Sequence, residues 1–197
     1  MAFQLPRLPK TAQVEPFYVD ANADMEPIVV GKVQTILRPG KWGVKVTIPE
    51  LNPVDARRFC AAQVRHKTEG GLISLSWPQA DVAQIPATAV VDGAGQTGAR
   101  LAVRGLTPGS TVPGFAFFSF EVAGEGFLYC TSADALVDAN GKALLPISPM
   151  VRVRPPDGAA LNFADPQIQG KLETGNVEWS LVRLRHTGVS FTITEIQ

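Results

Sequence analysis

The sequence carries little charge and no excess of either sign. Charged residues make up 18% of the 197 positions, and 18 Lys and Arg balance 18 Asp and Glu. Proteins that bind nucleic acid use an excess of basic residues to neutralise phosphates, so this balance argues against nucleic acid as the main partner. Net charge also keeps soluble monomers apart, and its absence makes self-association a reasonable expectation.

Cysteine and long apolar runs are scarce as well. We expect the two cysteines, Cys60 and Cys130, to be free thiols, because a chain of this length can bury enough surface to fold without a disulfide. The first residues lack the apolar core of a signal peptide. The longest apolar runs, such as residues 115–118, are far shorter than the roughly 20 residues that span a bilayer. These absences predict synthesis in the cytoplasm and no membrane anchor.

Helical patterns are also rare, and only residues 53–67 combine the signals of a helix. Asn52 offers a capping side chain, Pro53 suits the first helical position, and glycines 70 and 71 provide a stop. Residues at helical spacing predict a stripe packed against the rest of the fold. This stripe comprises Ala56, Phe59, Cys60, Gln63 and Val64.

The remaining chain has the pattern of short strands and turns, which agrees with its 18 Gly and 16 Pro. Trp42, Val44, Val46 and Ile48 alternate with other residues and predict a half-buried strand. We expect residues 28–37 to pair with this strand through a turn at 38–40. Further strands are predicted at residues 72–77, 88–91, 100–104, 115–122, 126–131, 142–147, 151–154 and 168–172, with a C-terminal hairpin over 177–193.

This order of elements predicts a mainly β fold, a β-sandwich with one packed α-helix and an inserted small β module. Residues 1–26 contain several prolines and no clear periodicity, so we expect an extended arm outside the core. We assign residues 27–84 and 161–197 to the sandwich and residues 85–160 to the inserted module.

No set of residues forms a recognisable catalytic or cofactor site, and we expect neither enzymatic activity nor a bound cofactor or metal. Residues 93–98 match the G-x-G-x-x-G dinucleotide motif, but the strand pattern that follows them offers no helix N-terminus for a pyrophosphate. His66 and His186 have no partners at metal-ligand spacing and are expected to be solvated or capping residues. The three tryptophans, Trp42, Trp77 and Trp179, fit core positions better than a sugar-stacking platform.

Five residues are candidates for contacts between subunits. Phe3, Phe17 and Tyr18 are aromatic side chains on the expected arm, where only docking on another surface would bury them. Arg57 and Arg58 belong to a basic helix face that also includes residues 65–67. That face is either simply solvated or an electrostatic contact with an acidic neighbouring subunit.

Three stretches together cover about two thirds of the chain. They are residues 41–49, 52–65 and 70–78, then residues 128–131 and 138–147 with Pro149 and Arg152, and finally the C-terminal hairpin that closes on residues 194–196. In this order they resemble the distal tail or baseplate-ring proteins of long-tailed, siphovirus-like bacteriophages. In that family a Trp-led strand, an Ala-rich helix with a central aromatic residue and a strand ending in Pro recur in this order, and an inserted module and a C-terminal hairpin follow.

This resemblance implies a tail-tube-like β-sandwich that assembles into a ring at the far end of the tail. The ring would be a hexamer, with a trimer as the second possibility, and would join the tail tube protein to the baseplate hub and the receptor-binding parts. DNA would pass through its channel only transiently, and the protein would reside in the virion after assembly in the host cytoplasm. A carbohydrate-binding β-sandwich of an adhesin-like protein is the alternative, and exposed tryptophans would favour it.

Overall fold

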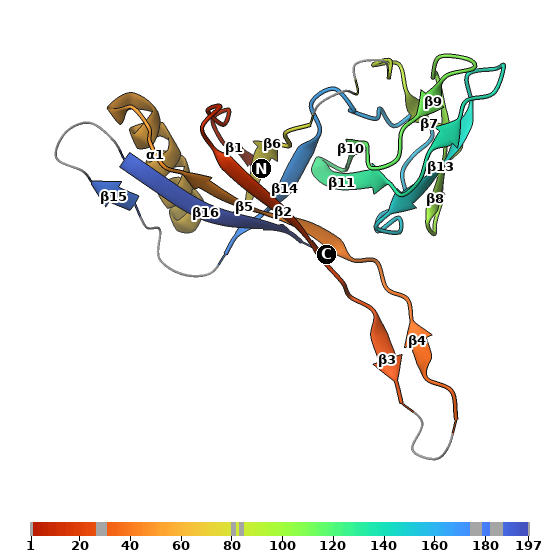
Figure 1. The fold of residues 1–197 in the computed structure, drawn as a ribbon, viewed down its shortest axis with the longest axis horizontal. Coiled ribbons are helices and arrows are strands. Elements are labelled where there is room, and N and C mark those ends of the chain that lie inside the picture. Colours follow the sequence, from red (N-terminus) through yellow and green to blue (C-terminus); the bar gives the residue numbers. More distant parts are fainter. Residues whose placement is uncertain are drawn as a thin grey trace.

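The computed structural model describes residues 2–26, 31–79, 82, 85–173, 179–181 and 187–196. Within these residues the chain forms one α-helix and sixteen β-strands, arranged as a larger sheet, a helix and a second group of strands (Figure 1). The helix and the hairpin over residues 117–131, which belongs to the second group, pack on the same face of the larger sheet. The predicted mainly β fold with one packed helix is therefore confirmed.

The larger sheet has seven strands, and β16 lies near its centre. β16 (Thr187–Glu195) pairs with β5 (Lys41–Ile48) and β14 (Gln167–Leu172), and β15 (Trp179–Leu181) pairs with its first residues. β6 (Leu72–Ser76) follows β14, and β1 (Ala2–Gln4) and β2 (Gln13–Val19) are the two edge strands. All these pairs are antiparallel except β1 with β6, which is parallel.

Helix α1 (Pro53–Glu69) begins at the predicted residue and continues past the predicted end at residue 67 to the predicted glycine stop. The Asn52 side-chain oxygen accepts hydrogen bonds from the backbone N–H groups of Val54 and Asp55 at 3.0 and 2.9 Å, which satisfies two of the open donors at the helix start. Gly70 follows the last turn with φ of 71°, a conformation in which a side chain would be strained, and its N–H bonds to the carbonyl of His66.

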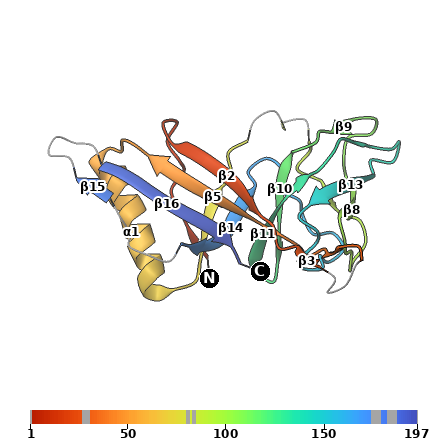
Figure 2. The same ribbon diagram turned by 60° about the horizontal axis from the view of Figure 1, so that its bottom comes forward.

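The buried face of α1 differs in part from the predicted stripe. Ala56, Phe59, Gln63 and His66 are buried, and the Phe59 ring stacks on Phe191 of β16 with centroids 6.4 Å apart. Figure 2 shows α1 beside β16. The spacing of three, four and three residues keeps this stripe on one line down the helix. Val64 lies off that line and is exposed, so its predicted burial is wrong. The sequence predicts a solvated or capping His66. It lies on the buried line, so the solvated alternative is wrong, and its backbone carbonyl accepts the capping N–H of Gly70.

The second group of strands spans most of the middle of the chain. Its main sheet runs in the order β10 (Phe117–Val122), β11 (Glu125–Thr131), β13 (Ala143–Ser148), β8 (Arg100–Arg104) and β7 (Val90–Val91). A two-stranded sheet of β9 (Thr111–Val112) and β12 (Ala135–Leu136) completes it. The sequence did not predict these last two strands, which are too short to show a period.

Two hydrophobic clusters meet at the β10–β11 hairpin. One fills the space between the larger sheet, α1 and one face of this hairpin, and the other lies among the strands of the second group. Leu128 and Cys130 point into the first cluster, whereas Phe127 and Tyr129 point into the second. Because successive side chains of a strand point to opposite faces, β11 contributes residues to both hydrophobic clusters.

The expected N-terminal arm is wrong for most of residues 1–26. β1 adds to β6 and β2 adds to β5, so both strands belong to the larger sheet. Leu5, directly after β1, is buried in the first cluster, and its N–H bonds to the Ser74 carbonyl at 2.8 Å. Prolines concealed this pattern, and Pro16 is tolerated because β2 is an edge strand.

The predicted pairing of residues 28–37 with the Trp42 strand is also wrong. β4 (Gln34–Ile36) pairs with β3 (Ala23–Met25), and β5 pairs with β2 instead. Residues 13–26 and 31–48 therefore pair along one long ribbon, whose far half projects from the body (Figure 1). Residues 28–30 lie outside the described part of the chain.

The other predicted strands are mostly present. Those at 72–77, 88–91, 100–104, 126–131, 142–147 and 168–172 correspond to β6, β7, β8, β11, β13 and β14 within a residue or two at each end. Residues 151–154 form no strand, although they were predicted to. Phe115 lies outside β10 in a turn with φ of 63°, because the chain reverses there before the strand begins.

Candidate assembly surface

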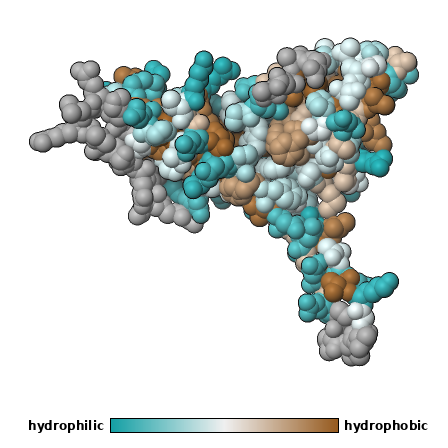
Figure 3. Space-filling view, viewed as in Figure 1, coloured by the Kyte–Doolittle hydropathy of each residue, from teal (hydrophilic) through white to brown (hydrophobic). Residues whose placement is uncertain are grey.

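The β3–β4 hairpin carries a set of exposed apolar side chains away from the body of the molecule. Met25 is 56% exposed and Leu37 is 66% exposed, with Val33 and Ile36 also in contact with solvent. Figure 3 shows these apolar patches between polar atoms on the projecting hairpin. Single exposed apolar residues are common, but four on one thin projection are a feature of surfaces that meet a partner.

Hydrogen bonds hold the hairpin where it leaves the larger sheet. The Asn22 side chain accepts from the Arg38 N–H at 3.0 Å, and the Asp20 carboxylate accepts from the Asn22 N–H at the same distance. Further out, the Thr35 hydroxyl donates to Asp24 across the two strands at 2.6 Å. The register shifts by one residue between the β2–β5 and β3–β4 pairs, which bends the ribbon at this joint.

Phe17 and Tyr18 lie at the base of this hairpin, on opposite faces of edge strand β2. The Phe17 ring covers Gly43, and the Tyr18 hydroxyl lies over Gly40; a Cβ atom on either glycine would overlap the ring. Tyr18 also makes an edge contact with Trp42, with centroids 5.1 Å apart. The two rings stay 37% and 42% exposed, so each keeps a free surface for a partner.

Phe115 extends this aromatic surface. It makes edge contacts with Trp42 and Phe117, at 6.4 and 5.0 Å between centroids, yet it is 66% exposed. Its φ of 63° is uncommon for a residue with a side chain, and such strain is concentrated at functional positions. Sequence reasoning placed Phe115 in a strand and so missed this exposure.

The other three predicted contact residues lie elsewhere. Phe3 is in β1, at the opposite edge of the sheet from Phe17 and Tyr18, and the Arg65 guanidinium lies 4.7 Å from its ring centre. Arg57 and Arg58 are exposed on α1, where Arg57 donates to the Pro53 carbonyl and Arg58 lies 3.5 Å from Asp55. Phe17 and Tyr18 therefore lie at one edge of the larger sheet, Phe3 lies at the other edge, and Arg57 and Arg58 lie on the helix.

A buried ion pair fixes the second group of strands against the larger sheet. Arg152, beyond β13, contacts Glu195 at the end of β16, and the Glu195 carboxylate also accepts from the backbone N–H groups of Trp42 and Leu128. Burial raises the pKa of Glu195, while Arg152 and the two N–H groups oppose that rise. The resemblance drew attention to Arg152, but no sequence signal named its partner.

Reactive side chains in the described residues do not converge on a catalytic arrangement. No three of their His, Cys, Asp and Glu side chains are grouped so as to hold a metal ion. Cys60 is half-buried and Cys130 is buried, both as free thiols, and burial raises the pKa of Cys130 to about 11. Burial, Lys67 and Lys171 lower the pKa of His66. His186 lies outside the described residues.

Residues 93–98 form a turn between β7 and β8. The Gln96 side chain occupies its centre, where it donates to the carbonyls of Asp92 and Ala102 and accepts from the Ala102 N–H. Strand β8 follows, as the sequence predicts, so this glycine motif serves a turn.

Comparisons with known proteins give no match: no protein-family model matches the chain, and no curated protein is similar enough in sequence to be a relative. None of the helices in the described part of the chain is long and apolar enough to cross a membrane.

Proposed function

We propose that this protein is a structural subunit that forms a closed ring at the distal end of a phage tail. The ring joins the tail tube protein to the baseplate hub and the receptor-binding parts, with six copies around a channel through which DNA passes. On this proposal the protein resides in the virion after assembly in the host cytoplasm, and it works through its geometry, without an active site.

The projecting β3–β4 hairpin carries this proposal. Within the described residues its strands pair only with each other, and its apolar side chains remain 41–66% exposed in the monomer. A second copy supplies that cover most simply, because the chain has zero net charge to oppose self-association.

The two edges of the larger sheet support a ring in particular. Phe17 and Tyr18 lie at one edge, whereas Phe3 lies at the other. A contact between two different surfaces repeats from copy to copy, and it closes into a ring when its rotation divides the circle. The resemblance to distal tail proteins then selects six copies.

The alternative function, a carbohydrate-binding module whose sugar stacks on exposed tryptophans, has less support. Trp42 and Trp77 are both buried and pack on Phe117, so they offer no stacking platform. The side chain of Trp179 lies outside the described residues.

Light scattering of hairpin variants tests the proposal. The wild type should have the mass of a hexamer, and a variant with Met25→Ser, Ile36→Thr and Leu37→Ser should lose the ring while its circular dichroism remains β-rich. The control variant, Leu136→Ser with Leu144→Ser, removes exposed apolar residues of the second strand group and should leave the mass unchanged. A monomeric wild type, or equal masses for both variants, would contradict the proposal. Deleting residues 2–20 is a poorer test because it removes β1 and β2 from the sheet.

A further inference from the structure

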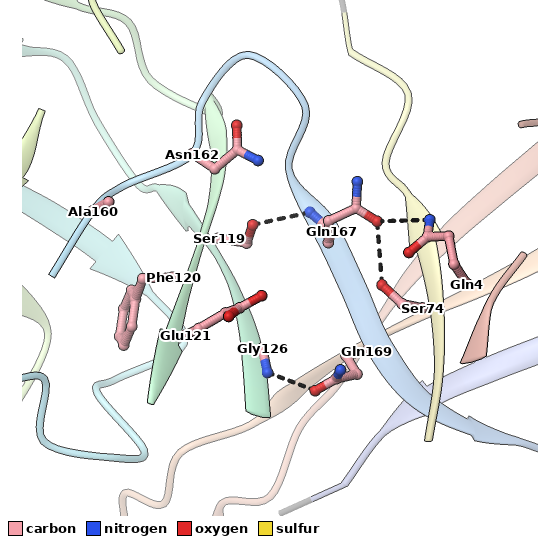
Figure 4. A pocket seen from close by; sticks show the side chains of 10 residues that line it. All are labelled: Gln4, Ser74, Ser119, Phe120, Glu121, Gly126, Ala160, Asn162, Gln167 and Gln169. Carbon is pink, nitrogen blue, oxygen red and sulfur yellow. Dashed lines mark hydrogen bonds between the residues drawn. The ribbon is translucent and has the colours of Figure 1, made fainter. Parts of the chain in front are cut away.

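A polar cleft of about 320 Å³ lies between the larger sheet and the β10–β11 hairpin. One wall is the outward face of the sheet, with Gln4 of β1, Ser74 of β6, and Gln167 and Gln169 of β14 (Figure 4). The other wall includes Ser119 and Glu121 of β10. The volume lies at the lower end of the range of about 300–1,000 Å³ typical of small-molecule sites.

The lining consists almost wholly of uncharged groups that both donate and accept hydrogen bonds. Amides and hydroxyls predominate, Glu121 is the single charged residue, and no Lys, Arg or His is among the residues that line the cleft. The Phe120 side chain is buried in the second hydrophobic cluster, so the lining offers little apolar surface. This composition differs from the aromatic and apolar surface described above, so the two surfaces suit different partners.

Internal hydrogen bonds hold part of the lining in place before any ligand arrives. The Gln167 side-chain oxygen accepts from Gln4 and from the Ser74 hydroxyl, both at 3.2 Å, and its backbone N–H donates to Ser119 at 3.0 Å. The Gln169 side-chain oxygen accepts from the Gly126 N–H at 2.5 Å. Fixed polar groups of this kind lose little entropy on binding.

Other polar atoms in the cleft remain open. Within the described part of the chain, the Glu121 carboxylate, the Gln4 side-chain oxygen and the Gln169 side-chain nitrogen have no hydrogen-bond partner. In Figure 4 the Glu121 side chain extends between the Ser119 and Gly126 positions toward the β14 wall. The cleft therefore offers one strong acceptor, one further acceptor and one donor to a ligand.

We propose that this cleft binds a neutral saccharide. A carboxylate with no cation nearby repels phosphates and acidic sugars, and an apolar ligand would leave the amides without partners at a cost in free energy. Sugar hydroxyls both donate and accept hydrogen bonds, as the amide groups of the lining require. Because one chain supplies the whole lining, binding does not depend on assembly into a ring.

Saturation-transfer NMR on the full-length protein tests this site. The probes are glucose, galactose, mannose, rhamnose, N-acetylglucosamine and their common disaccharides, with glucose 6-phosphate and N-acetylneuraminic acid as anionic comparisons. We expect at least one neutral sugar to bind in the millimolar range and the anionic sugars to bind more weakly. The absence of binding by every neutral probe, or equal binding of the phosphate, would overturn the proposal.

Two matched variants locate the binding. Glu121→Ala removes the open carboxylate from an exposed position of β10, and Glu125→Ala removes one outside the cleft at the β10–β11 turn. Loss of a hydrogen bond to a charged acceptor should weaken sugar binding about tenfold or more for Glu121→Ala, with no change for Glu125→Ala. Equal effects of the two variants, or no effect of either, would contradict a site at this cleft. These outcomes are independent of the mass measurement that tests the ring.

Discussion

Arg152 and Glu195 form an ion pair that is almost completely withdrawn from solvent. The guanidinium nitrogen Nη2 lies 2.7 Å from Oε1 of Glu195, and the two side chains are 5% and 1% exposed. The same guanidinium lies over the rings of Phe127 and Tyr129, at 5.4 and 5.3 Å. This pair joins the second strand group to β5 and β16 of the larger sheet, and so determines how the two parts of the molecule meet.

Replacing Arg152 with Met should destabilise the protein by about 3–5 kcal/mol, because the Glu195 carboxylate would remain buried without its partner. Denaturant unfolding measures this loss. The control is Lys142→Met, which breaks the more exposed pair with Asp92 and should cost less than about 1 kcal/mol. Equal losses for the two variants would show that burial of the Arg152 pair has no special role.

The Arg152→Met deficit should also depend on pH. Burial already raises the pKa of the Glu195 carboxyl, and loss of Arg152 removes the group that most strongly opposes this rise, so the folded-state pKa lies further above the unfolded value. A group of this kind contributes stability below its unfolded pKa and loses it as pH rises through the folded pKa. The deficit should therefore be largest near neutral pH and shrink in mild acid, and a deficit that grows in acid would contradict this assignment.

Asp157 should make the opposite contribution. Its hydrogen bonds from Arg104 and from the Gly93 N–H lower its pKa from 3.8 to about 2, so its stabilising effect is present above pH 3.8 and is lost as pH falls toward 2. Asp157→Asn should lower the melting temperature at neutral pH, and the difference from wild type should vanish near pH 2. Glu125→Gln, at an exposed turn, is the matched control and should show no such convergence.

Phe59→Ala should lower the free energy of unfolding by about 3 kcal/mol, because Phe59 of α1 is buried against Phe191 of β16 and its removal leaves a cavity. Val64→Ala on the exposed side of the same helix should change the free energy of unfolding by less than about 0.5 kcal/mol. Chemical denaturation of both variants compares them directly. A loss of similar size at the two positions would argue against the packing of α1 on β16.

Gly43→Ala should displace the Phe17 ring from its position over Gly43, since the added Cβ would overlap that ring. The change should lower the free energy of unfolding by about 1–3 kcal/mol. In a Phe17→Ala background the same change should cost much less, because the obstacle is gone. A double-mutant cycle on unfolding free energies measures the coupling. If the cost of Gly43→Ala is the same in both backgrounds, Phe17 does not occupy this position.

Local signals predicted the parts of the fold that local chemistry determines. The cap at Asn52, the glycine stop at Gly70 and the alternation of Trp42 to Ile48 all involve residues that are neighbours in the sequence, and all are present in the structure. The pairing of β1 with β6 and of β2 with β5 joins residues far apart in the chain, and the prolines near these strands masked their period. Such long-range pairings depend on the complete folded structure, so no short stretch of the sequence predicts them.

The candidate surfaces were predictable only in part for the same reason. The exposure of the Phe17 and Tyr18 rings could be predicted, because the neighbouring sequence offered no residues that would bury them. The projecting hairpin could not, since it needed the correct pairing of β3 with β4. The cleft draws Gln4, Ser74 and Gln167 from three separate stretches, and only the assembled sheet brings them together.

Negative-stain electron microscopy of the purified protein is the most direct test of the ring. We expect class averages of closed rings with six-fold symmetry and a central hole, and we expect the Met25, Ile36 and Leu37 triple variant to yield only small single particles. Isolated wild-type particles at every concentration, or open filaments in place of rings, would contradict the account.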